Sequence, residues 1–171
     1  MQEIERRDLR LHVLLLKQDD PHKCTAAKLA KFGLANTIFR FRQIPSKSLV
    51  LNPTAARVIL PIDGTIRDLV AIDCSWEKAE TELRRGIPGL ARRLPTLLAA
   101  NPTNYAKKHK LSSVEALAAA TYIMGRDEIA DKLLSLFKWG NTFLTLNKEL
   151  LEAYSSASSE EELSKIEGDF F

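Results

Sequence analysis

The sequence predicts an α/β protein, with a parallel β-sheet covered by helices on both faces in the first half and only helices in the second half. Two features of the 171-residue chain predict this fold. Short apolar runs alternate with helical patterns as far as about residue 100, which is typical of the strands and helices of a parallel sheet. After Asn101-Pro102, amphipathic helical patterns follow one another without strands. We therefore expect an α/β domain at residues 1–100 and an all-helical domain at residues 101–171.

The elements of the first half follow in order along the chain. Leu9–Leu16 is a dense apolar run, the pattern of a strand buried on both faces. A helical pattern covers Thr25–Phe32, and Gly33 is placed to end it. After the strand that ends at Asp73, Ser75 is a suitable N-cap for a further helix. The remaining strands are expected at Ala35–Arg42, Ser48–Leu51, Val70–Asp73 and Leu94–Ala100.

The second half predicts three helices and a tail. Ser112 and Glu115 have the spacing of a capping box at the start of an alanine-rich helix that Gly125 ends. Two amphipathic helices and one weak helix in the serine- and glutamate-rich tail should follow, at Asp127–Phe137, Thr142–Tyr154 and Ser159–Ile166.

Composition narrows the class of protein. Hydrophobic residues make up 45% of the chain and charged residues 27%, as in soluble globular proteins. No apolar run approaches the roughly 18 residues of a membrane-spanning helix, and the polar N-terminus is unlike a signal peptide. Two cysteines are too few for a disulfide framework. We therefore expect a cytoplasmic protein with reduced thiols, in contact with no membrane.

The charges are distributed unevenly. Residues 1–60 carry 11 Lys/Arg against 5 Asp/Glu, a balance of +6, whereas residues 101–171 carry 8 basic and 11 acidic residues, a balance of −3. A basic first half suits a polyanionic partner such as RNA. Solvated lysines on an ordinary surface would give the same imbalance, so charge alone leaves both interpretations open.

Parallel α/β sheets bind ligands beyond the carboxyl ends of their strands. Three segments follow expected strands: Pro21–Thr25, Leu51–Pro53 and Asp73–Trp76. Two of them lead into helix N-termini, whose free backbone N–H groups attract anions, and Ser112-Ser113 begins another helix. A ligand carboxylate between the Pro21–Thr25 segment and Ser112-Ser113 would suit this arrangement.

Asp73 is the sharpest single candidate, because it ends an apolar strand at the expected mouth of a site. It is either a functional carboxylate or a cap of the following helix. Trp76 lies one turn into that helix with Ala79 three residues later on the same face, and it is either a ligand platform or a core residue. We expect no metal site, because the histidines and cysteines that could bind zinc do not have the spacing of a zinc motif. These residues are His12, His22, Cys24 and Cys74.

Five segments resemble one family in order along the chain. They are KCTAAKLAKFG, LVLNP, AIDCSWEKAE, RRLPTLLAANPTNYAKKHKLSSVEALAAATYIMG and LLSLFKWGNTFLTLNKELLEAY, from about Leu9 to Tyr154. They are similar to the ribosomal RNA aminocarboxypropyltransferases, which use S-adenosylmethionine to modify a pseudouridine in small-subunit ribosomal RNA. One departure is Ala106, where glycine is usual after Asn-Tyr. The resemblance implies a fold like that of the SPOUT methyltransferases, with the helical half threaded into a trefoil knot.

The resemblance also implies a cofactor site between the two halves. The backbones of Leu94 and His109 should read the edge of the adenine, and the carbonyl of Ile72 the ribose. Thr25 and the backbone of Ser113 should hold the carboxylate of the aminocarboxypropyl arm. Apolar residues should enclose the adenine and the methyl group, with Trp76 in both roles: Leu51, Pro53, Trp76, Ala79, Leu94, Leu111 and Ala116.

The implied reaction attacks the first carbon of the amino-acid arm, so the enzyme must present that carbon and shield the methyl group. Trp76 and Ala79 would shield it, and Asp73 is the candidate general base. The partner would be small-subunit ribosomal RNA or a pre-ribosomal particle bound by a monomer, with phosphates on Lys17, Lys23, Arg40, Arg42 and Lys47. Two alternatives stay open: a SPOUT-type methyltransferase, and a non-catalytic RNA-binding factor in ribosome assembly.

Overall fold

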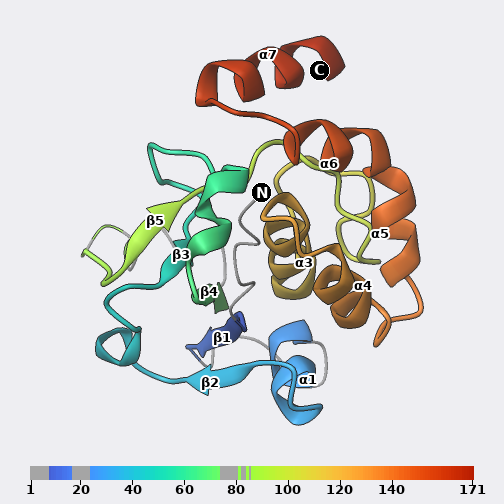
Figure 1. The fold of residues 1–171 in the computed structure, drawn as a ribbon. Coiled ribbons are helices and arrows are strands. Elements are labelled where there is room, and N and C mark those ends of the chain that lie inside the picture. The colour runs from blue at the N-terminus through green and yellow to red at the C-terminus, as the bar shows by residue number, and fades with distance from the viewer. Residues whose placement is uncertain (1–7, 17–23, 74–80, 82–83, 85) are drawn as a thin grey trace.

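A five-stranded parallel sheet forms the centre of the first half. We analysed a computed structural model, which describes residues 8–16, 24–73, 81, 84 and 86–171. The strands lie in the order β2-β1-β4-β3-β5, and each neighbouring pair is parallel (Figure 1). The predicted parallel sheet is therefore confirmed. Its strands are β1 (Arg10–Leu15), β2 (Asn36–Ile38), β3 (Leu49–Leu51), β4 (Asp68–Asp73) and β5 (Leu90–Arg92).

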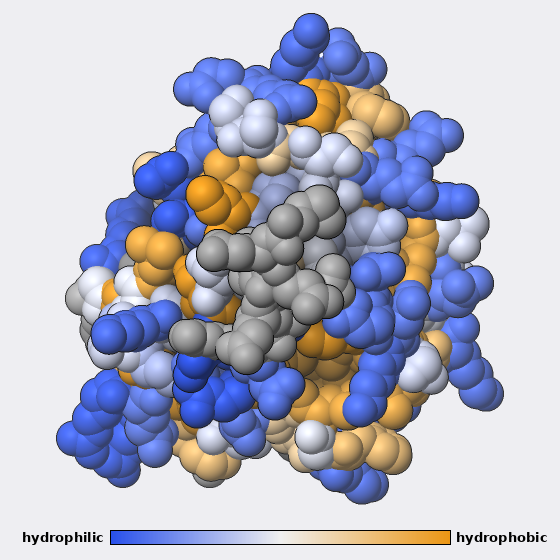
Figure 2. All heavy atoms as spheres, in the orientation of Figure 1, coloured by the Kyte–Doolittle hydropathy of each residue, from blue (hydrophilic) through white to orange (hydrophobic). Residues whose placement is uncertain are grey.

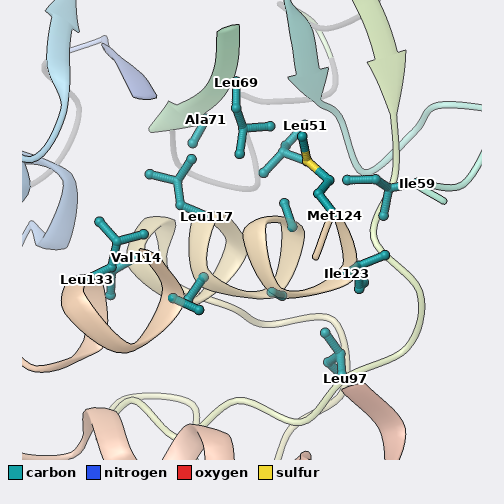
Figure 3. Packing of buried hydrophobic residues seen from close by; sticks show 14 of the residues in the cluster. Leu51, Ile59, Leu69, Ala71, Leu97, Val114, Leu117, Ile123, Met124 and Leu133 are labelled. Carbon is teal, nitrogen blue, oxygen red and sulfur yellow. The ribbon is translucent and has the colours of Figure 1, made fainter. Parts of the chain in front are cut away.

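The two faces of the sheet are covered differently. Side chains alternate along β4, so Leu69 and Ala71 enter the larger hydrophobic cluster while Val70 enters a smaller one. Helices α1 (Thr25–Lys31) and α3 (Ser113–Ile123) contribute to the larger cluster, and Figure 3 shows side chains of α3 pointing toward those of β4.

On the other face, the described cover is the 3₁₀ turn η1 (Phe41–Gln43) with Ile44 and Ile87. The expected helices are thus confirmed on one face. The helix expected after Asp73 lies mostly outside the described residues.

Helices build the second half: α3, α4 (Asp127–Leu134), α5 (Gly140–Leu146), α6 (Lys148–Tyr154) and α7 (Glu160–Phe170). The single helix expected over Thr142–Tyr154 is two helices, because Asn147 interrupts it. The backbone leaves helical geometry at Asn147, with φ of −108° and ψ of 11°, and its side-chain amide also donates to the Phe143 carbonyl at 2.9 Å. The predicted capping box of Ser112 and Glu115 is confirmed, and α7 is longer than the weak helix expected there.

Two strand predictions need correction. Only Asn36–Ile38 of the expected Ala35–Arg42 strand is extended in the sheet, and η1 follows it. The expected strand Leu94–Ala100 is not part of the sheet, in which β5 is the last strand along the chain. A second 3₁₀ turn, η2 (Pro61–Thr65), precedes β4. Residues 94–100 are apolar because Leu97, Ala99 and Ala100 enter the core, and an apolar run does not by itself distinguish burial from sheet pairing.

No helix among the described residues is both long and apolar enough to cross a membrane. Figure 2 shows hydrophilic residues over much of the face seen there, with smaller hydrophobic patches between them.

Candidate active site

The carboxyl edge of the sheet brings the ends of several strands together. Asp73 ends β4 and lies in register with Leu15 at the end of β1, and Leu51 at the end of β3 lies in register with Arg92 at the end of β5. The carboxyl ends of these strands therefore lie at one edge of the sheet, where parallel sheets bind their ligands.

The N-termini of two helices lie beside this edge. Cys24 is the N-cap of α1, and Ser112 is the N-cap of α3. The backbone N–H of Val114 donates to Thr25 Oγ1 at 3.2 Å, which joins the two helix starts directly. The sequence placed these helix starts on either side of one ligand carboxylate, and the structure brings them together.

Asp73 lies between the same two helix starts. Its half-buried carboxylate accepts a hydrogen bond from Cys24 Sγ at 2.8 Å on Oδ2, and one from Ser113 Oγ at 3.1 Å on Oδ1. Both donors are neutral, so they orient the carboxylate without neutralising its charge. Asp73 thus contacts both halves of the chain.

Sequence reasoning missed Cys24, which it considered only as a metal ligand. Burial and the hydrogen bond to Asp73 raise the pKa of the Cys24 thiol from 9.0 to about 11. The group is therefore a protonated donor at neutral pH. The signal that could have found it is its place directly before a helix, where a sulfur can accept the N–H of Ala27, here at 3.4 Å.

Four residues predicted to flank the adenine belong to one hydrophobic cluster. Leu51 is buried in it, and the others pack against it at its edge: Leu94, Leu111 and Ala116. Pro53 is exposed two residues after Leu51. Ile72 packs in the smaller cluster on the opposite face. The predicted apolar wall thus comes from β3, the chain after β5 and the start of α3.

His109 is exposed and has a left-handed backbone, with φ of 57°. Its N–H donates to the Leu97 carbonyl at 3.3 Å, so a backbone contact of His109 with an adenine amino group would come from its carbonyl. Ala106 also has a positive φ, of 62°. This conformation favours glycine, the residue that the family resemblance leads us to expect at the position of Ala106.

A buried carboxylate holds the chain that leads to α3. Glu115 is 0% exposed. Its Oε1 accepts the backbone N–H groups of Ala100 at 2.6 Å and Asn101 at 3.0 Å, and its Oε2 accepts the N–H of Ser112 at 2.7 Å. The capping-box glutamate thus also fixes both ends of the 101–111 segment.

Side chains of the last helices hold the chain before that segment. Asn147 pairs with both backbone groups of Leu98, accepting its N–H at 2.8 Å and donating to its carbonyl at 2.9 Å. Thr96 donates its N–H to Glu167 at 2.6 Å and accepts the hydroxyl of Tyr154 at 2.9 Å. These long-range contacts have no periodic signal in the sequence, so sequence reasoning did not find them.

Three of the predicted RNA contacts lie close together. Arg40, Arg42 and Lys47 are exposed, within and around the 3₁₀ turn that follows β2. The other predicted site residues lie outside the described part of the chain: Lys17, Lys23, Trp76 and Ala79. No group of three or more His, Cys, Asp or Glu side chains among the described residues could hold a metal ion.

The amino edge of the sheet holds a second cluster of charged groups. Arg10 donates twice to Asp68, from Nε at 2.9 Å and from Nη2 at 2.8 Å, and His12 Nε2 lies 2.7 Å from Asp68 Oδ1. Burial disfavours the charged carboxylate, but the hydrogen bonds from Arg10 and His12 outweigh it and lower the pKa of Asp68. Asp68 is therefore held in its ionised form.

Two family models match the chain. One, described as the C-terminal region of a ribosome biogenesis protein, matches residues 49–171. The other, described as a possible Fer4-like domain in RNase L inhibitor, matches residues 9–38. Iron–sulfur clusters are held by several cysteine thiolates, and residues 9–38 contain one cysteine, Cys24, whose thiol donates to Asp73. This segment therefore does not fit a cluster site.

Relatives of known class match nearly the whole chain. A 16S rRNA aminocarboxypropyltransferase of Methanococcoides burtonii is 42% identical over 170 residues, covering 96% of each chain. One of Halobacterium salinarum is 46% identical over 159 residues, covering 93% of this chain and 94% of the relative. The solved SAM-dependent rRNA:acp-transferase Tsr3 from Vulcanisaeta distributa superposes with a TM-score of 0.83 at 38% identity, covering 94% of this chain and 97% of that one. The chain belongs to the ribosome biogenesis protein family that includes these 16S rRNA aminocarboxypropyltransferases.

Proposed function

We propose that this chain transfers the 3-amino-3-carboxypropyl group of S-adenosylmethionine to a pseudouridine, or methylpseudouridine, of small-subunit ribosomal RNA. The observation that carries the proposal is the Asp73 carboxylate, which lies at the carboxyl edge of the sheet between the starts of α1 and α3. The named activity of the relatives supports the class of reaction and the cofactor.

The residues around Asp73 fit the proposed cofactor. Thr25 Oγ1 accepts the Val114 N–H, so its own hydroxyl hydrogen is left to donate to a carboxylate. Ser113 begins an eleven-residue helix, whose N-terminal N–H groups favour the same anion. The apolar wall defined above suits an adenine. The site would lie between the α/β domain at 1–100 and the helical domain at 101–171, with Ile72 and His109 contributing backbone carbonyls.

Two further residues complete the proposal. Trp76 would pack on the adenine and, together with Ala79, enclose the methyl group. An enclosed methyl carbon offers a nucleophile no line of approach, which directs attack to the aminocarboxypropyl arm.

The transfer step forms one N–C bond, breaks one C–S bond and releases one proton, so it needs one proton acceptor. The sulfonium of S-adenosylmethionine supplies an electron-poor carbon and leaves as a neutral thioether, 5′-methylthioadenosine. A ring nitrogen of the base forms the new N–C bond and must lose its proton. Asp73 is the proposed acceptor, and Cys24 and Ser113 fix the direction of its oxygens.

Pseudouridine is compatible with this chemistry. Its sugar is attached through carbon, so both ring nitrogens carry a proton, and a pseudouridine methylated on one nitrogen keeps a proton on the other, which the new N–C bond replaces. The RNA would approach over Arg40, Arg42 and Lys47, together with Lys17 and Lys23, and the base would be flipped out or lie in a loop.

The proposal is tested by incubating the purified chain with S-adenosylmethionine and small-subunit RNA, then measuring nucleoside masses and the nucleoside co-product. Transfer of the aminocarboxypropyl group should release 5′-methylthioadenosine and add the mass of that group to one nucleoside. A methyltransferase would instead release S-adenosylhomocysteine and add a methyl group. A non-catalytic assembly factor would show no heat of S-adenosylmethionine binding in calorimetry and leave the RNA unchanged.

The SPOUT-like trefoil knot stays a separate prediction, on which the proposed function does not depend. The family match and the solved relative do not support the knot. The backbone path of an experimental structure tests the knot. The prediction is wrong if that path becomes a straight line when the two ends of the chain are pulled apart.

A further inference from the structure

The second half of the chain is acidic except in one short segment. Residues 112–171 carry 5 basic and 11 acidic residues. Residues 101–111, in contrast, contain three lysines and a histidine and no acidic residue. We call residues 101–111 the basic loop. Its charge is hidden in the overall negative balance of this half, so the loop was not among the expected RNA contacts.

The base of the basic loop is tied to the preceding chain. Ala99 donates its N–H to the Lys107 carbonyl at 3.0 Å and accepts the N–H of Ala106 at 2.7 Å. Asn101 Oδ1 accepts the N–H of Asn104 at 3.1 Å, which closes the turn. Together with the hydrogen bonds of the buried Glu115, these contacts tie both ends of the loop to the neighbouring chain.

The exposed side chains of the basic loop include three lysines and one tyrosine. Tyr105 is 58% exposed, and Lys107, Lys108 and Lys110 are exposed as well. Lys108 Nζ lies 4.3 Å from the centroid of the Phe171 ring, so the C-terminal residue supports that part of the loop. Surfaces that bind single-stranded RNA commonly combine lysines, which contact the phosphates, with an aromatic ring on which a base stacks.

The basic loop also lies next to the candidate active site. Ser113, which donates to Asp73 at 3.1 Å, follows Lys110 by three residues. Three residues of extended chain span at most about 11 Å, so the end of the loop lies close to Asp73.

We propose that the basic loop is a second RNA-contacting surface, in which Tyr105 stacks on an unpaired base next to the modified nucleotide while Lys107, Lys108 and Lys110 contact its phosphates. The inference rests on the proposed function, because that function requires RNA at Asp73. RNA bound at this loop would lie beside the start of α3, whose first residue, Ser113, contacts Asp73.

The test compares two pairs of lysines on the same half. Binding of a labelled small-subunit RNA transcript is measured across a series of KCl concentrations for the wild type, K107A/K110A and the control K132A/K148A. Both control lysines are exposed on helices outside the loop. Removing phosphate contacts from the loop should lower the slope of log K against log salt by about 1 to 2, because each contact contributes roughly 0.7 to 0.9. The control should keep the wild-type slope.

Tyr105→Ala should weaken RNA binding by roughly fivefold to a hundredfold, the scale of a lost base stack, with little change in slope. Affinity for S-adenosylmethionine should be unchanged in every variant. Equal slopes for K107A/K110A and K132A/K148A, with normal binding by Tyr105→Ala, would overturn the inference. A wild type that binds RNA through the loop but transfers no group would instead refute the proposed reaction and leave the surface standing.

Discussion

Strand β4 carries an aspartate at each end, and the two carboxylates have opposite surroundings. Asp68, at the amino end, is nearly buried and accepts hydrogen bonds from Arg10, with His12 at 2.7 Å. Asp73, at the carboxyl end, is half-buried, and within the described part of the chain it takes its hydrogen bonds from the neutral donors Cys24 and Ser113.

The difference follows from the direction of a parallel sheet. The starts of α1 and α3 lie at the carboxyl edge, where Asp73 accepts hydrogen bonds from Cys24, the N-cap of α1, and from Ser113, the first residue of α3. At the amino edge, Asp68 is instead paired with the neighbouring side chains of Arg10 and His12. One strand thus carries a carboxylate paired with cationic side chains at one end and, at the other, the carboxylate to which the proposed function assigns the chemistry.

The largest expected effect is a difference in reaction rate between substitutions at the two ends of β4. Asp73→Asn should lower the single-turnover transfer rate by roughly 10²- to 10⁴-fold at saturating S-adenosylmethionine, because the amide cannot accept the proton. Asp68→Asn is the matched control and should keep the rate in its folded form. Thermal melts must show that Asp73→Asn is folded. Near-normal turnover by that variant would remove Asp73 from the mechanism.

The second prediction concerns the thiol that contacts Asp73. At pH 8, a thiol with a pKa of about 11 is about a thousandth ionised, whereas an exposed cysteine is about a quarter ionised. In a Cys74→Ser background, alkylation of Cys24 by iodoacetamide should therefore be roughly a hundredfold slower than that of a cysteine peptide, and should accelerate toward pH 11. Mass spectrometry of the alkylated protein measures the rate.

Asp73→Asn sharpens this prediction. Removing the carboxylate should lower the pKa of Cys24 and speed its alkylation, while burial keeps the rate below that of the peptide. Fast alkylation of Cys24 in the wild type at pH 8 would contradict the hydrogen bond between the two residues.

The third prediction concerns the amino end. Asp68→Asn should lower the free energy of unfolding by about 2 kcal/mol at pH 7, because Arg10 and His12 lose a charged partner. The pKa of Asp68 is lower in the folded chain than in the unfolded chain. Its contribution is therefore present above the unfolded value of about 4 and is lost as pH falls through the folded value. Urea unfolding from pH 7 to pH 3 should show a steeper loss of stability for the wild type than for the variant.

The smallest expected effect concerns the backbone near the carboxyl edge. Ala106 has φ of 62°, so Ala106→Gly should relieve strain and raise the free energy of unfolding by up to about 1 kcal/mol, after the entropy of the unfolded glycine is subtracted. Gly125 is the matched reverse case, with φ of 77° and open space around its Cα. Gly125→Ala should lower stability by about 1 kcal/mol. Equal effects of the two substitutions would exclude backbone strain as the cause.

The sequence was sufficient for features set by local patterns. The parallel sheet, the end of β4 at Asp73 and the capping box of α3 all follow from apolar runs and cap residues, and the structure agrees with them. Leu94–Ala100 was wrongly predicted as a strand, because a buried segment outside a sheet has the same apolar composition as a strand inside it.

The contacts that shape the candidate site were beyond sequence reasoning. Cys24 meets Asp73 across 49 positions of the chain, and Asn147 meets Leu98 across 49 positions as well. Such pairs depend on how distant elements pack, and a single sequence has no periodicity that records them. The family resemblance supplied the identities of the expected ligand contacts, and the structure added the residues that hold them.

A crystal structure of the chain with bound S-adenosylmethionine tests the central comparison most directly. We expect density at the carboxyl edge of the sheet, with the ligand carboxylate at Thr25 and Ser113 and the adenine against Leu51 and Leu111. The methionine arm should pass beside Asp73. Density at the amino edge beside Asp68, or on the helical half away from α3, would contradict the assignment of chemistry to the carboxyl end of β4.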